Sequence, residues 1–127
     1  MKPIAALIHV ADIDSALTWY QSVFPTSQRI HSESIKLAML DVDGFLIEIV
    51  EADDKVSSGK CGSVLYWSVA NLNRVLSRFV SFGGKLYRGP MQIEDGFCMC
   101  QIEDPFGNLI GLRGVISREE FSGFAKS

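Results

Sequence analysis

The sequence predicts an α+β fold made of two tandem modules, each a strand, a helix and three further strands. Two internal repeats in the 127-residue chain support this prediction. The segment "VADIDSALTWY" (10–20) matches "VANLNRVLSRF" (69–79) at an offset of 59 residues, and "DVDGFLIEI" (41–49) matches "DPFGNLIGL" (104–112) at an offset of 63. Matching caps, turns and apolar positions at near-constant spacing indicate that one structural unit occurs twice.

Alternating apolar residues predict the strands, and apolar residues at helical spacing predict the helices. Asp12 and Asn71 stand at N-cap positions, while Gly83 and Gly84 are stop signals for the second helix. In the first module we expect a strand at 3–10, a helix at 13–23 and strands at 27–31, 35–41 and 45–51. In the second module we expect a strand at 63–69, a helix at 72–82 and strands at 85–89, 96–102 and 108–113.

We expect a single domain over residues 1–127, with the first module at about 1–52, the second at about 62–114 and a tail at 115–127.

"DVDG" and "DPFG" predict hairpin-type turns before the last strand of each module. "YRGP" (87–90) predicts the end of a strand, so that Tyr87, Arg88 and Met91 would lie near or in a loop. Ser117 and Glu120 form a capping-box pattern, which predicts a short final helix.

Composition excludes several classes of partner. The net charge of -3, a pI near 5.3 and the lack of a basic cluster argue against nucleic acid or a membrane surface as partner. No apolar run approaches the roughly 20 residues that span a bilayer, and the first residues lack a signal-peptide pattern. We therefore expect a cytoplasmic protein with reduced thiols.

Cys98 and Cys100 would pack on one face of a strand; a metal or redox pair is the alternative.

The tandem units, "HVADIDSALTWYQSVFP" (9–25) and "DPFGNLIGL" together resemble the vicinal oxygen chelate superfamily, over residues 3 to about 114. This family includes glyoxalase I, bleomycin-resistance proteins, fosfomycin-resistance enzymes and extradiol dioxygenases. The resemblance implies a curled mixed sheet around a cleft shared by the two modules, and a homodimer. It does not imply one reaction, because function depends on the site.

Metal-using members of the family carry His or Glu at four positions in the first and last strands of the modules. By this resemblance the four positions are Ala5, Glu48, Val64 and Gly111. Only Glu48 can bind a metal, whereas a catalytic zinc site uses about three protein ligands. His9 lies four residues beyond Ala5, a displacement of about 13 Å along a strand, and cannot replace the missing ligand. We expect no metal ligand and no cofactor, with a divalent metal as the disfavoured alternative, and we interpret Gly111 as an empty ligand position.

Strand alternation places His9, Glu48, Tyr66 and Arg113 on the side of the sheets away from the helices. With Tyr87 they are the predicted ligand-binding residues, and Glu48 is the candidate catalytic residue. A largely apolar cleft with these few polar groups suits a small molecule. We therefore expect a metal-free small-molecule binder similar to the bleomycin-resistance branch. The alternative is a lyase or isomerase resembling glyoxalase I, with Glu48 as base and with or without a divalent metal. The sequence leaves open whether the protein is an enzyme.

Overall fold

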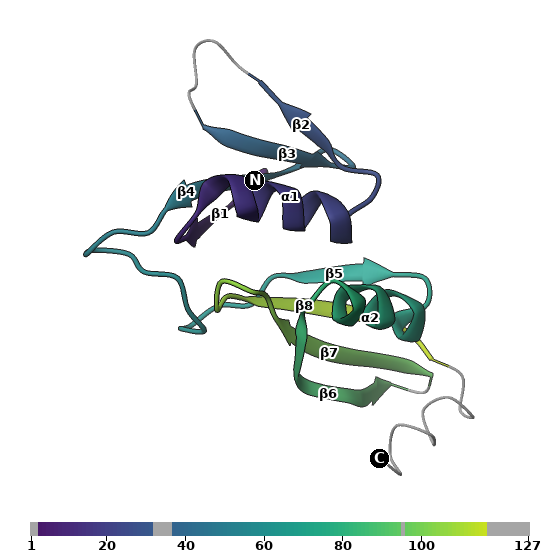
Figure 1. Cartoon of the computed structure of the whole chain (residues 1–127). Coiled ribbons are helices and arrows are strands. Elements are labelled where there is room, and N and C mark those ends of the chain that lie inside the picture. Colours follow the sequence, from purple (N-terminus) through teal and green to yellow (C-terminus); the bar gives the residue numbers. More distant parts are fainter. Residues whose placement is uncertain (1–2, 32–36, 95, 117–127) are drawn as a thin grey trace. The chain divides into compact units, whose positions relative to one another are not determined.

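The structure, a computed structural model, describes residues 3–31, 37–94 and 96–116. The chain divides into two compact units, Met1–Ser58 and Gly59–Ser127. Each unit contains one module with a four-stranded mixed sheet and a helix (Figure 1). The predicted α+β class and the tandem arrangement of two modules are confirmed.

The first module has its sheet strands in the order β1-β4-β3-β2. Its elements are β1 (Ala5–Val10), α1 (Ile13–Val23), β2 (Gln28–Ile30), β3 (Ala38–Val42) and β4 (Phe45–Glu51). β1 runs parallel to β4, and the other two pairs are antiparallel. α1 packs on β3 and β4, and the strand side chains on that face are almost completely buried, among them Leu40, Ile47 and Ile49.

The second module repeats this topology, with the strand order β5-β8-β7-β6. Its elements are β5 (Tyr66–Val69), α2 (Leu72–Ser81), β6 (Lys85–Glu94), β7 (Phe97–Glu103) and β8 (Leu109–Val115). β5 runs parallel to β8, as β1 does to β4. α2 packs on β6, β7 and β8, and Cys100, Ile102 and Leu112 have no exposed surface in this core. Cys98 is also buried, and both thiols are free, in agreement with the packing prediction.

The helix boundaries agree with the sequence to within one residue. α1 covers the predicted range, and α2 ends at Ser81, with Gly83 in the left-handed region at φ +94°. Asn71 caps α2, because its side chain accepts a hydrogen bond from the backbone N–H of Arg74 at 3.0 Å. Asp12 occupies the N-cap position of α1 without a side-chain bond to the backbone; its carboxylate accepts from the Ser15 hydroxyl.

Both predicted turns are present, and they differ in length. Asp43 and Gly44, at φ 52° and 91°, form a two-residue turn between β3 and β4. Positive φ at both central residues is typical of a type I′ hairpin. The second turn joins β7 to β8 and is organised by Asp104, which is 3% exposed. One of its carboxylate oxygens accepts hydrogen bonds from the N–H groups of Phe106 and Asn108, each at 2.8 Å.

The prediction that "YRGP" ends a strand is wrong. β6 continues through Gly89 and Pro90 to Glu94, so Tyr87, Arg88 and Met91 lie within a strand and not in a loop. Proline is tolerated because β6 is the last strand of its sheet and pairs only with β7 among the described strands. Its pairing with β7 is irregular on both sides of Arg88.

Two predictions fall outside the described residues: the start of the third strand at 35 and the final helix suggested by Ser117 and Glu120. Among the residues that the structure describes, neither helix is long and apolar enough to cross a membrane.

We predict that Asp104→Ala lowers the free energy of unfolding by about 1–3 kcal/mol, because the two N–H groups lose their acceptor. Asp104→Asn keeps an acceptor oxygen in place and should lose less. Urea unfolding of both variants and the parent protein measures the difference. Equal stability of all three proteins would show that the turn does not depend on this carboxylate.

Because the Cys100 thiol is buried, we expect the free energy of unfolding to fall at high pH. Burial raises its pKa from 9.0 to about 12, so the thiol ionises more readily in the unfolded chain. The stability that the protonated, buried Cys100 thiol contributes is fully present below pH 9. It is lost as the pH rises from about 9 to about 12, because the unfolded chain then releases the proton first. In this window the parent protein should lose up to about 1.4 kcal/mol of unfolding free energy per pH unit relative to Cys100→Ala. Guanidinium unfolding of both proteins at pH 8 and 10.5 tests this, and parallel pH profiles would contradict it.

Candidate functional site

His9, Glu48, Tyr66 and Arg113 lie on the sheet face opposite the helix of their module, here called the helix-free face. Positions paired across a sheet share a face. In the second sheet one row contains Tyr66, Gly111 and Gln101, and the next contains Ser68, Arg113 and Met99. The predicted alternation is therefore confirmed for Tyr66–Val69 and for β8, whereas Val64 and Leu65 lie before β5 begins.

The first module brings His9 and Glu48 to one helix-free face. Leu7 pairs with Glu48 and His9 with Val50, which separates the Cα atoms of His9 and Glu48 by roughly 8 Å from the usual strand spacings. Within the described part of this module, the half-buried Glu48 forms no ion pair. Among residues 3–31, 37–94 and 96–116, no three His, Cys, Asp or Glu side chains gather so that they could hold a metal ion.

Asp53 follows β4 and adds a second carboxylate to the His9 end of this module. Its Oδ1 accepts from the N–H groups of Val56 and Lys55 at 2.8 and 2.9 Å. These two bonds, with a smaller contribution from the charge of His9, hold the pKa of the exposed Asp53 carboxyl below its usual value. The carboxylate of Asp53 is thus ionised in the neighbourhood of His9.

Gly111 has no side-chain donor, but the space beside it is filled by a protein side chain, which corrects its interpretation as an empty position. The ring of Tyr66 lies over it, and a Cβ atom at Gly111 would come within 2.4 Å of the ring carbon Cδ1. The same pair of positions in the first module holds Leu7 and Glu48. The glycine therefore provides room for an aromatic ring of the neighbouring strand, in the space that a side chain at 111 would need.

Tyr66 also contacts two other side chains of the helix-free face. Its hydroxyl is 2.7 Å from Nε2 of Gln101, and the guanidinium carbon of Arg113 lies 4.2 Å from its ring centroid. We call Tyr66, Gln101 and Arg113 the Tyr66 cluster. Two of its members were predicted as ligand-binding residues, and Gln101 was missed. Strand alternation along 98–102, with Cys98, Cys100 and Ile102 on the helix side, could have placed Gln101 on this face. Its partner depends on the length of the following turn.

Tyr87 belongs to a different group of side chains. The ammonium of Lys60 lies 5.7 Å from the Tyr87 ring centroid and forms an ion pair with Glu103. The hydrogen bond to Glu103 raises the pKa of Lys60 above its ordinary value. Among the described residues, no hydrogen bond, ion pair or ring contact joins Tyr87 to the Tyr66 cluster.

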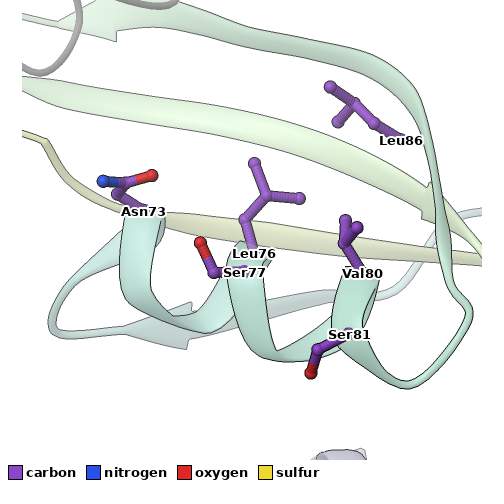
Figure 2. A pocket seen from close by; sticks show the side chains of 6 residues that line it. All are labelled: Asn73, Leu76, Ser77, Val80, Ser81 and Leu86. Carbon is purple, nitrogen blue, oxygen red and sulfur yellow. The ribbon is translucent and has the colours of Figure 1, made fainter.

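A hollow of about 370 Å³ lies on the opposite side of the second sheet, between α2 and β6 (Figure 2). The aliphatic side chains of Leu76, Val80 and Leu86 line it, together with the polar side chains of Asn73, Ser77 and Ser81. Leu86 pairs with the buried Ile102, which places it on the helix side of the sheet. The hollow is therefore separate from the Tyr66 cluster and contains none of the predicted site residues.

We predict that Gly111→Ala is destabilising by about 1–3 kcal/mol, because the new methyl group overlaps the Tyr66 ring. In a Tyr66→Ala background the same substitution should cost much less, since the ring is gone. Chemical unfolding of the two single variants and the double variant measures this coupling. Additive effects would mean that the ring does not occupy the space over Gly111.

The chain matches the Glyoxalase/Bleomycin resistance protein/Dioxygenase superfamily model over residues 3–112. No curated protein matches it in sequence.

Solved structures share the fold. A glyoxalase/bleomycin resistance protein/dioxygenase family enzyme from Burkholderia phytofirmans PsJN has a TM-score of 0.72 and 21% identity, over 88% of this chain and 97% of that one. An integron cassette protein from V. cholerae has a TM-score of 0.72 and 17% identity, over 90% and 94%. The fosfomycin resistance protein FosX from Listeria monocytogenes has a TM-score of 0.70 and 13% identity, over 97% and 96%.

At these identities the structures show the fold alone, whereas the family model covers most of the chain. The repeated module, its strand order and the extent of this match lead to one conclusion: the chain belongs to the Glyoxalase/Bleomycin resistance protein/Dioxygenase superfamily.

Proposed function

We propose that the protein binds a small organic molecule without a metal ion, and that the helix-free face of the second module contributes to the site. The observation that carries this proposal is the ring of Tyr66 over Gly111. A metal-binding side chain at position 111 would have to project into the space that this ring fills.

The residues at the four family positions do not fit a divalent metal. Ala5, Val64 and Gly111 offer no side-chain donor, which leaves Glu48 as the one carboxylate. At Gly111 the missing side chain is replaced by a phenol ring held by two neighbours, and not by another ligand. A catalytic metal site with about three protein ligands is not available from this set.

The Tyr66 cluster has the composition of a small-molecule site. It combines a guanidinium, an amide and a phenol with the apolar side chain of Met99, which pairs with Arg113. Small-molecule sites are mostly apolar, with a few polar groups that fix the orientation of the ligand. Arg113 is exposed and Tyr66 is half-buried, so both are accessible on this face.

A lyase or isomerase resembling glyoxalase I, with Glu48 as base, is the second candidate. It is supported by the half-buried Glu48, which lies opposite Leu7 and Met39 and forms no ion pair within the described part of its module. His9 lies on the same face and stays a predicted ligand-binding residue. A cytoplasmic location and a homodimer also stay predictions from the sequence.

We predict that the purified, tag-free protein contains no stoichiometric metal and that added nickel, zinc or manganese leaves its melting temperature unchanged. In contrast, some members of a panel of metabolites and drugs should raise the melting temperature, because a ligand of the native state adds about 2.7 kcal/mol at a hundredfold excess over its Kd. Elemental analysis and thermal-shift measurements provide the test. About one metal per chain, or stabilisation by one of the metals, would contradict the proposal and favour a metal-dependent lyase or isomerase.

A further inference from the structure

We propose that the ligand of the second module is a small carboxylic acid with an apolar body, whose carboxylate binds Arg113 and Tyr66. This inference rests on the proposed function and names the class of molecule that the Tyr66 cluster would select. Four observations support it: the donors of Arg113, the donors left on the Tyr66–Gln101 pair, the charge around them and the methionines beside them.

Arg113 contacts the Tyr66 ring and has no anionic partner within the described part of its module. Its guanidinium carbon lies 4.2 Å from the centroid of the Tyr66 ring, and a guanidinium has five N–H donors, which a contact with a ring face does not use up. Within residues 59–94 and 96–116, no carboxylate forms an ion pair with it. A guanidinium that already contacts a ring loses less freedom on binding, and its fork of donors matches the two oxygens of a carboxylate.

The hydrogen bond between Tyr66 and Gln101 leaves a further donor. The amide Nε2 of Gln101 donates to the phenol oxygen, so the Tyr66 O–H proton and the second N–H proton of Gln101 remain available. The pair thus offers a neutral donor beside the guanidinium of Arg113, and no acceptor among the described residues takes it.

The charge around the cluster is positive. Arg88 pairs with Gln101 across the sheet and is exposed. Glu103 is two residues along β7 from Gln101, but its charge is paired with Lys60. Among the described residues of this module, Arg88 and Arg113 form no ion pair, and Glu103 is already compensated by Lys60. This arrangement favours an anionic ligand over a cationic one.

Two methionines lie in the row beside the cluster. Met99 pairs with Arg113 on one side and with Met91 on the other, so the three side chains line up across β8, β7 and β6. Met99 is 9% exposed and Met91 is 40% exposed. Flexible thioether chains adapt to apolar groups of different shape, and aromatic rings contact sulfur favourably. An acid with an aromatic or aliphatic body would thus bind Arg113 and Tyr66 through its carboxylate and the two methionines through its apolar part.

Benzoate, its neutral isostere benzamide and inorganic phosphate are the probes, titrated into ¹⁵N-labelled protein and followed by NMR. Benzoate should shift the backbone amide of Gly111 and the side-chain amide of Gln101, and benzamide and phosphate should bind at least about tenfold more weakly. Arg113→Gln should weaken benzoate binding about tenfold or more. Tyr66→Phe, which keeps the ring, should weaken it less. Arg74→Gln makes the same charge change on an exposed arginine of α2 and should leave the affinity unchanged.

The outcomes separate this inference from the proposed function. Equal binding of benzoate and benzamide, or binding unaffected by Arg113→Gln, would overturn the carboxylate assignment and leave a metal-free binder of neutral molecules. Phosphate binding as strong as benzoate would overturn the need for an apolar body. No benzoate binding at all would overturn the inference as well. A metal bound by the purified protein, or stabilisation by added nickel, zinc or manganese, would overturn the proposed function itself. Unchanged melting temperatures of the variants without ligand verify that each one folds.

Discussion

The parallel pairing of the first strand with the last strand of each module is the constraint on which the structure depends. This pairing joins strands that are far apart in the sequence, β1 to β4 and β5 to β8. The helix that follows the first strand of each module packs on one face of the sheet. The same register applies in both modules, so Leu7 meets Glu48 where Tyr66 meets Gly111. The composition of the candidate site depends on this register, because the register decides which side chains share a face.

The two modules use this shared geometry in different ways. In the first, the last strand carries an acidic side chain and the first strand an aliphatic one. In the second, the last strand carries no side chain at that position, and an aromatic ring from the first strand covers it. The guanidinium of Arg113 contacts this ring, and the amide of Gln101 donates a hydrogen bond to its hydroxyl. Duplication of one unit thus gives two faces with distinct chemistry, although the backbones follow the same order.

Much of the fold could be predicted from the sequence, because the repeat, the caps and the apolar alternation are local signals. The helices and turns were confirmed for this reason. β6 was not, since its continuation past Pro90 depends on its place at the end of a sheet, which no local pattern records. The contents of the space over Gly111 could not be predicted either. The sequence shows that a side chain is missing there, but only the cross-strand register shows that the Tyr66 ring takes its place. Gln101 was missed for the same reason.

The irregular course of β6 has a consequence for the behaviour of the protein at high concentration. An outer strand with regular, unpaired N–H and C=O groups can recruit a strand of another molecule and start aggregation. In β6 the proline lacks an N–H, and the pairing irregularities around Arg88 interrupt the even spacing of the backbone groups. Lys85 and Arg88 add positive charge along the same strand. These features make β6 a poor template for strand addition, even though it is ten residues long and carries exposed apolar side chains such as Met91 and Ile93.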